Sequence, residues 1–221
     1  MIRCGAFESP ARGYVLGAMQ EVLPGMLHWT TFHEGIGRPV HSHFFVDGAA
    51  LFDPRVPEEG IEELARHGRP ETILLSNRHH LRHAEAIAQA FDCPIKAHRS
   101  GLHEFRDGPD VRPFEFGDTV APGVTALPVG VLTPEDTAFH IDTGPGALLF
   151  ADALIRDGDG QLAFVPDGLM GDEPDAVHDG LRDALASLLG ERFDALLFAH
   201  GEPLPSGGRE ALEAFLAAQR A

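Results

Sequence analysis

Short apolar runs separated by Gly, Pro and Asp dominate the first half of the chain, the pattern of buried strands joined by tight turns. Five runs predict strands, at residues 27–32, 43–48, 49–54, 71–76 and 93–98. Gly48 follows Asp47 as a hairpin signal between the second and third runs. A helix is predicted over 57–68, and four apolar residues at helical spacing predict another: Ala84, Ile87, Ala88 and Phe91.

The second half begins with five more strand-like runs, which predict an antiparallel meander: 112–118, 124–130, 136–142, 146–152 and 161–167. A long helix opens near Pro174, and its apolar side is Val177, Leu181, Leu185 and Leu188. A buried strand then ends at His200. Ser206 is a candidate cap for a last helix, whose inward residues are Ala211, Leu212, Phe215 and Leu216.

Both halves mix strands with helices, so the pattern predicts an α/β (α+β) chain with two sheets facing each other and helices outside. At 221 residues, the length suits one domain over 1–221. Residues 1–25 show no clear period, and we expect an irregular N-terminal segment there.

Charge and composition narrow the class of protein. The formal net charge is -17, from 17 basic and 34 acidic residues, so a phosphate backbone would be repelled and no nucleic acid partner is expected. The start of the sequence lacks a signal-peptide pattern and no apolar run approaches the length of a membrane span. We therefore expect a cytoplasmic protein without membrane association. Cys4 and Cys93 form no CxxC pattern, which argues against disulfides and a thiolate zinc site.

Polar residues follow three of the apolar runs that predict buried strands. In layered folds, active and binding sites commonly lie at such strand ends. The turn "SNRHHLRH" follows the run at 71–75, Asp152 follows "ALLFA", and His200 follows a second "ALLFA". With the early "FFVDGAALFDP" and the turn "TPED", this order of elements resembles the metallo-beta-lactamase fold hydrolases over residues 27–221. The resemblance implies a four-layer αββα sandwich with two mixed sheets and helices outside.

The resemblance also implies a ligand set. The family's turn reads HxHxDH, and its later ligands are a histidine in a GHTPGH-like turn, an aspartate and a last histidine. With Ser76 in the place of the motif's leading threonine, His79 takes the second ligand position, while Asp152 and His200 keep the late positions. The other four positions hold residues that do not suit a cation: Asn77, Leu81, Arg82 and Leu132. We therefore predict a degenerate site that binds zinc, iron or manganese weakly or no metal at all.

A slip of one residue gives a second register of the turn. His80 and His83 then become ligands beside Asp152 and His200, which would complete a mononuclear site. Under this alternative the chain is a metal-dependent hydrolase of a small ester, thioester or lactone, in which the bound water attacks a carbonyl.

Under the first register, Arg78 and Arg82 lie at a helix start where the family's metal would sit. They are candidate ligand-binding residues for a small anionic molecule such as a carboxylate or phosphate. The leading hypothesis is thus a non-catalytic or weakly active descendant that binds a small anionic ligand.

Two further patterns are expected to carry no metal. His41 and His43 share a strand face, but no carboxylate follows at a useful spacing. The acidic segment 156–161 lacks the later glutamate of a calcium loop and better suits a hairpin turn.

Overall fold

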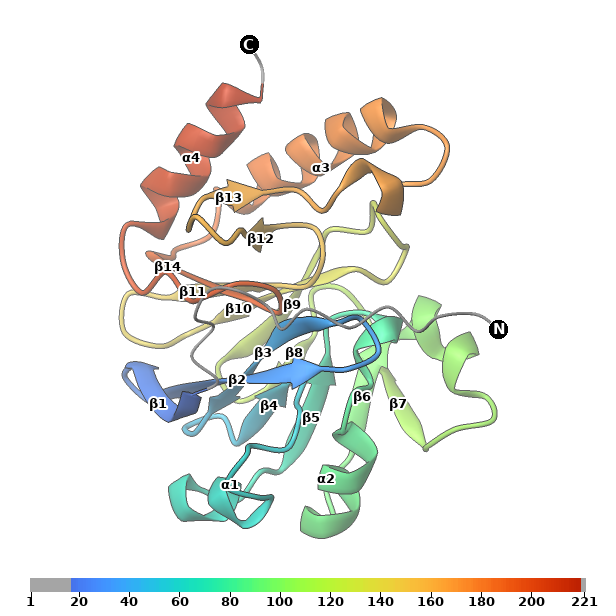
Figure 1. The fold of residues 1–221 in the computed structure, drawn as a ribbon, viewed down its shortest axis with the longest axis vertical. Helices are drawn as coiled ribbons and strands as arrows, with labels where there is room; N and C mark the ends of the chain where they lie inside the picture. The colour runs from blue at the N-terminus through green and yellow to red at the C-terminus, as the bar shows by residue number, and fades with distance from the viewer. Residues whose placement is uncertain (1–16, 220–221) are drawn as a thin grey trace, which may run out of the picture.

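The computed structural model describes residues 17–219, which form two large sheets packed face to face (Figure 1). The first sheet has the order β1-β2-β3-β4-β5-β6-β7. Pairing is antiparallel from β1 to β4 and parallel from β4 to β7. Its strands are β1 (Gly17–Leu23), β2 (Met26–His33), β3 (Arg38–Phe45), β4 (Ala50–Phe52), β5 (Thr72–Leu75), β6 (Ile95–His98) and β7 (Val111–Phe114).

The second sheet has the order β14-β11-β10-β9-β8, in which β14 pairs with β11 in parallel and the other pairs are antiparallel. Its strands are β8 (Thr119–Ala121), β9 (Val124–Pro128), β10 (Thr137–Ile141), β11 (Ala147–Phe150) and β14 (Ala195–Phe198). A separate two-stranded hairpin joins β12 (Ile155–Arg156) to β13 (Leu162–Ala163).

Within residues 17–219, four α-helices flank the sheets, with α1 and α2 on one side and α3 and α4 on the other (Figure 1). They are α1 (Glu62–His67), α2 (Ala84–Phe91), α3 (Pro174–Leu188) and α4 (Gly208–Ala218). Three short 3₁₀ helices complete the described elements: η1 (Arg78–His80), η2 (Arg99–Phe105) and η3 (Asp167–Leu169). No helix within 17–219 has the length and apolarity required to cross a membrane.

Three apolar clusters show how the layers are held together. Inward residues of both sheets, such as Phe52 and Phe139, pack against each other in the middle cluster. The outer face of the first sheet packs on α1 and α2, with Leu64 and Ile87 buried there. The outer face of the second sheet packs on α3 and α4, where Leu181 is buried. Because each interface removes apolar surface from water, the layers are stable only together.

The expected αββα sandwich, with two mixed sheets and helices outside, is therefore confirmed. The hairpin at Gly48 joins β3 to β4 as predicted. The acidic segment 156–161 is a hairpin turn, in which Asp157 Oδ1 accepts the backbone N–H groups of Asp159 and Gln161.

Some sequence predictions were wrong. The meander holds only from β8 to β11, because β7 joins the first sheet in parallel to β6 and β13 pairs with β12. Ser206 does not cap α4, whose N-cap is Gly207 in the left-handed region. Residues 1–25 were expected to be irregular, but part of this segment is strand β1, which pairs with β2 in antiparallel orientation. Residues 24–25 form the turn between β1 and β2, and residues 1–16 lie outside the described residues.

The topology brings the ends of four strands to one edge of the sandwich. Asp53 follows β4, and Ser76 follows β5, its parallel neighbour. In the second sheet Asp152 lies just beyond β11, and His200 just beyond β14, again a parallel pair. Carboxyl ends of parallel strands lie together, so polar side chains from both sheets can meet across this edge.

Candidate metal site

Asp53 is the buried anchor of the site. Its Oδ1 accepts the backbone N–H of Ser76 at 2.8 Å, and its Oδ2 accepts the Ser76 hydroxyl and lies 3.0 Å from His80 Nδ1. The Asp53 side chain is 2% exposed and that of His80 is 7% exposed, so neither relies on water for its partners. The contact fixes the His80 ring with its other nitrogen, Nε2, toward the second sheet.

Three side chains converge at the edge of the sandwich. Asp152 Oδ1 lies 3.6 Å from His80 Nε2 and 3.2 Å from His200 Nε2. One donor atom from each of the three residues lies within 4.8 Å of the other two. The side chains of Asp152 and His200 are 28% and 23% exposed, so the cluster opens to solvent on that side. Asn77 holds the other carboxylate oxygen, Oδ2, through its amide at 2.7 Å.

Charge is unevenly distributed over the cluster. Burial would lower the pKa of His80, but the Asp53 and Asp152 carboxylates raise it to about 9. Burial would likewise raise the pKa of Asp152, but His80 and His200 hold it well below its usual range. Burial lowers the pKa of His200, although Asp152 opposes this. Without a cation, therefore, a protonated His80 lies between two carboxylates and His200 is neutral.

Asp136 is a fourth acidic group near the cluster. It is buried directly before β10, and neither carboxylate oxygen has a hydrogen-bond partner among residues 17–219. Burial raises the pKa of this carboxyl well above its usual value, and the nearby Asp152 charge raises it further. Both effects favour the protonated form of the Asp136 carboxyl.

Arg82 ties the two sheets together beside the cluster. Its Nη1 donates to the backbone carbonyls of His41 and Asp53, both at 2.7 Å, and its Nη2 donates to the carbonyl of Ala199 at 3.3 Å. The residue has φ +43°, a left-handed conformation that is costly for a side chain with a Cβ. Its hydrogen bonds go to backbone carbonyls rather than to a carboxylate.

The structure brings together only some of the sequence candidates. His80, Asp152 and His200 meet, whereas His79 is exposed on η1 and His83 accepts the backbone N–H of Val56 through Nδ1. The Asn77 side chain caps η1 by accepting the backbone N–H of His79, and the His79 side chain remains exposed. Neither histidine joins the cluster. The first register therefore supplies two of its three residues, whereas the second supplies all three and adds His83, which lies outside the cluster.

The two arginine candidates are engaged by protein acceptors. Arg78 Nη1 lies 2.6 Å from Glu135 Oε1, and the Glu135 side chain is 1% exposed. Arg82 has the three carbonyl contacts described above. Their proposed role as an anion site stays a prediction.

Sequence reasoning missed Asp53 and Asp136. Asp53 follows the apolar run of β4, the same signal that singled out Asp152 and His200. Asp136 lies in the "TPED" turn, which was noted for Leu132 alone. In each case the available signal was a carboxylate next to a buried strand, where an ionised group needs a partner.

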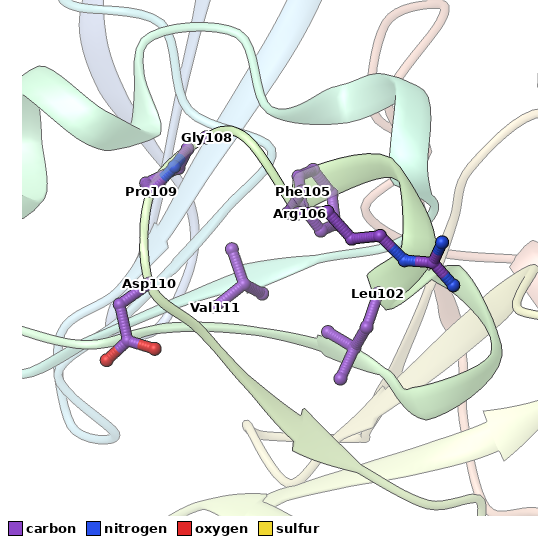
Figure 2. A pocket seen from close by; sticks show the side chains of 7 residues that line it. All are labelled: Leu102, Phe105, Arg106, Gly108, Pro109, Asp110 and Val111. Atoms are coloured by element: carbon purple, nitrogen blue, oxygen red, sulfur yellow. The ribbon is translucent and has the colours of Figure 1, made fainter.

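A surface depression lies apart from this chemistry. It has a volume of about 390 Å³ and is formed by η2 and the loop that leads into β7, with Leu102, Phe105 and Val111 on its wall (Figure 2). Arg106 and Asp110 also line it, but no histidine does. It therefore offers no ligand set for a borderline cation.

Comparison with known proteins gives structural relatives only. No family model and no curated protein matches the chain. A metallo-beta-lactamase from Erythrobacter litoralis superimposes with TM-score 0.65 at 13% identity, over 95% of this chain and 98% of that one. A B3 metallo-beta-lactamase with an active-site glutamic acid gives 0.63 at 13% identity, over 91% and 87%. A flavodiiron core from Synechocystis sp. PCC6803 gives 0.63 at 14% identity, over 92% and 62%.

Proposed function

The chain has the metallo-beta-lactamase fold, and we propose that it is a hydrolase-like protein that holds one divalent cation at the edge of its sandwich. The ligands are His80 Nε2, His200 Nε2 and Asp152 Oδ1. The observation that carries the proposal is the approach of these three donor atoms, from three separate strand ends, to within 4.8 Å of one another. We assign it the hydrolysis of a small ester, thioester or lactone.

The donor set fits a borderline cation. Two imidazoles and one carboxylate are a common ligand set for zinc in hydrolases and for non-haem iron, and three protein ligands leave positions for water and substrate. His80 also has the partner that metal-bound histidines usually have, because Asp53 holds its other ring nitrogen. The exposed side of Asp152 and His200 provides the entry path.

Net charge explains why binding would be weak. With His80 neutral, the nearby fixed charges are the carboxylates of Asp53 and Asp152 and the guanidinium of Arg82, which leaves one net negative charge. In addition, His80 must lose its proton before Nε2 can act as a ligand. Both effects lower affinity at neutral pH, in line with the weakly held cation expected from the sequence.

Each residue has a defined task in such a site. A bound cation would supply an acidified water and polarise the substrate carbonyl. Asp53 orients the His80 ring, and Asn77 holds Asp152 Oδ2 so that Oδ1 faces the two imidazoles. Asp136 is a buried acidic group near Asp152 whose raised pKa favours its protonated form, so it adds little negative charge beside the cation.

The hypothesis of a non-catalytic anion binder has less support. It requires free guanidinium groups, whereas Arg78 and Arg82 already donate to protein acceptors. A ligand would have to displace Glu135 or three backbone carbonyls.

The test is the metal content of protein purified without a histidine tag or chelator, measured by elemental mass spectrometry after equilibration with Zn²⁺, Fe²⁺ or Mn²⁺. We expect Asp152→Asn and His80→Asn to contain about one ion per chain fewer than the unchanged chain. His79→Asn is the matched control, because this neighbouring histidine is exposed and outside the cluster. Equal contents in all four proteins would refute the site.

Activity is tested on the same set of proteins. p-Nitrophenyl acetate, an acyl thioester and a γ-lactone represent the three substrate classes. Turnover that follows metal content, lost in His80→Asn and retained in His79→Asn, supports the hydrolase. A fully loaded protein that hydrolyses none of them overturns the assigned reaction but leaves the metal site standing.

A further inference from the structure

A second group of histidines lies on the inner face of the first sheet. His28 on β2 is directly opposite His43 on β3, and His41 precedes His43 by two positions. Residues two apart on a strand share a face, so all three imidazoles project from the same side. Met26 and Phe45 lie opposite each other on that face too, and both belong to the cluster between the sheets. The histidines therefore point into the sandwich.

The three rings are in close contact. His28 Nε2 lies 2.8 Å from His41 Nδ1, and these two rings stack with centroids 5.1 Å apart and an interplanar angle of 11°. The His43 ring lies 5.1 Å from that of His28. The three residues are only 1%, 4% and 1% exposed. Three imidazoles are thus packed where a core would normally place apolar side chains.

The hydrogen-bonding capacity of this group is not filled. Within the described residues, His28 Nδ1 and His43 Nε2 are buried without a hydrogen-bond partner. A buried polar atom without a partner destabilises the fold, so native structures rarely keep several together without a ligand or a water. These two atoms lie beside the contact between His28 Nε2 and His41 Nδ1, so the surroundings of that contact are polar but not fully hydrogen-bonded.

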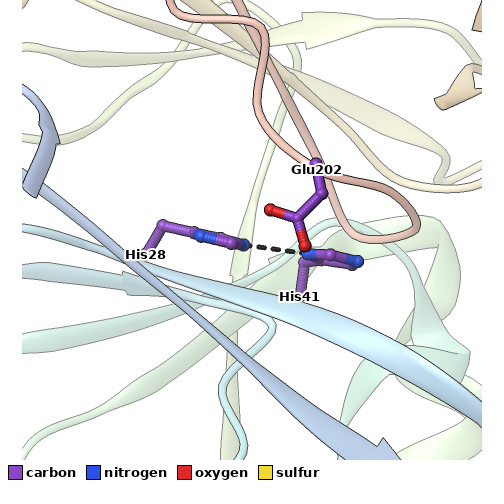
Figure 3. A group of neighbouring side chains, drawn as sticks. All are labelled: His28, His41 and Glu202. Atoms are coloured by element: carbon purple, nitrogen blue, oxygen red, sulfur yellow. Dashed lines mark hydrogen bonds between the residues drawn. The ribbon is translucent and has the colours of Figure 1, made fainter. Parts of the chain in front are cut away.

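A carboxylate approaches the histidines from the second sheet. Glu202 lies on the loop after β14, and its side chain extends over His41 (Figure 3). One oxygen of Glu202 lies within 4.8 Å of a nitrogen of both His28 and His41. Glu202 is exposed, which leaves an entrance from solvent on this side.

The loop that carries Glu202 is held in place by Arg156. Arg156 Nη1 donates to the backbone carbonyls of Glu202 at 3.3 Å and Pro203 at 2.9 Å, and the Arg156 N–H donates to the His200 carbonyl at 3.0 Å. The position of Glu202 is therefore set by backbone contacts and not by its own side chain.

We propose that His28, His41 and Glu202 bind a second transition-metal cation, of the class that prefers imidazole nitrogen with one carboxylate, such as Zn²⁺ or Co²⁺. None of these ligands belongs to the cluster of His80, Asp152 and His200, so the proposal does not rest on the proposed function. Two nitrogens bound at about 2.0–2.1 Å in a tetrahedral site are farther apart than 2.8 Å. The two rings must therefore separate by a fraction of an ångström when the cation replaces their shared proton.

The experiment uses the full chain with Asp152→Asn, which removes the first site, and titrates it with Zn²⁺ by calorimetry and with Co²⁺ by visible absorption. We expect one saturable site. Adding Glu202→Gln should weaken its affinity about tenfold or more, since the loss of an outer partner alone costs 10–100-fold. Because Glu202 is exposed, this change leaves the buried histidines intact. Glu210→Gln, an exposed carboxylate on α4, is the matched control and should bind as the parent does.

The outcomes separate the two sites. The inference is overturned if Asp152→Asn binds no cation. It is also overturned if the double variant with Glu202→Gln binds as tightly as the double variant with Glu210→Gln, because the histidines then form only a hydrogen-bonded structural group. If Asp152→Asn keeps one ion that Glu202→Gln loses, the second site stands, whatever happens to hydrolysis. Nitrogen hyperfine splitting in the Cu²⁺ electron paramagnetic resonance spectrum of Asp152→Asn must indicate two imidazoles; fewer would also contradict the assignment.

Discussion

The Asn77 side chain donates to Asp152 Oδ2 at 2.7 Å, across the edge where the two sheets meet. A side chain at position 77 therefore reaches the carboxylate that also contacts His80 and His200. An amide nitrogen has no lone pair for a cation, so this contact orients Asp152 without adding a ligand.

Asn77→His is expected to strengthen the first site, because an imidazole at this position adds a fourth donor atom. The expected gain in Zn²⁺ affinity is about tenfold, equal to about 1.4 kcal/mol. Calorimetric titration of the variant measures it, and Asn77→Ala is the control, since it removes the amide and supplies no donor. An affinity for Asn77→His no higher than that of the unchanged chain would show that position 77 does not reach the cation.

Asp53→Asn is expected to destabilise the metal-free protein strongly. The change leaves protonated His80 without its closest buried counter-ion, and removal of one partner of a buried pair costs about 3–5 kcal/mol. We expect the lower end of this range because Asp152 remains nearby. Urea unfolding measures the loss. Asp179→Asn, in an exposed pair with Arg182, should cost less than about 1 kcal/mol, and equal losses would argue against the buried pair.

The metal-free protein is expected to lose stability as the pH rises from 6.5 to about 9. The pKa of His80 is about 9 in the folded chain against 6.5 for an ordinary histidine, so its contribution is complete below pH 6.5 and fades through pH 9. Asp136, whose pKa is raised from 3.8, adds a decline in stability that begins at lower pH. The decisive measurement is therefore urea unfolding in a chelator across this range for the parent and for His80→Asn. The parent must show the steeper decline; parallel curves would mean that His80 is not protonated.

Arg82→Met is expected to weaken the contact between the two sheets. It removes the guanidinium donor from the carbonyls of His41, Asp53 and Ala199. The Asp53 carbonyl keeps the Ser42 hydroxyl and the Ala199 carbonyl keeps the His41 N–H, so we expect a total loss of about 1–3 kcal/mol. The melting temperature should fall by several degrees or more. Arg66→Met, on the exposed surface of α1, should leave it nearly unchanged. A stable Arg82→Met protein would show that water replaces the guanidinium at this edge.

Gly201→Ala is expected to impair both metal sites without altering a ligand. Gly201 has φ +117°, and a Cβ there would lie 2.2 Å from the Arg156 carbonyl oxygen, so the loop must shift. Its neighbours in this loop are His200 and Glu202, one ligand from each site. Cobalt titration should reveal weaker binding at both. Gly171→Ala is the control, since Gly171 also has positive φ (+77°) but open space around it. Normal binding in Gly201→Ala would mean that the loop adapts.

The alternation of strands and helices was enough to predict the layered fold, because burial on one face or both leaves a local pattern in the chain. Asp152 and His200 were found for the same reason: each follows a continuous apolar run. The partners of β7 and β13 could not be predicted. Both strands are short, and an apolar run alone does not tell whether it pairs with the strand before it or with the strand after it.

The turn at 76–83 was the hardest part to predict. Three histidines and two arginines lie close together there, and a rotation of η1 by one position decides which of them faces the second sheet. Here Asn77 caps η1 and Asp53 captures His80, and both contacts depend on the tertiary fold. The pairing of His41 with Glu202 was also hidden, because the carboxylate comes from the other sheet and much later in the chain.

The three carbonyl contacts of Arg82 have a consequence for how the protein is made. Many small metalloproteins fold only when they bind their metal ion, and the chain stays unfolded without it. In this chain the positively charged guanidinium of Arg82 already joins strand ends of both sheets through these hydrogen bonds. Folding can therefore run to completion when metal is scarce, and binding of the proposed cation would be a later, reversible event that follows the supply of the ion.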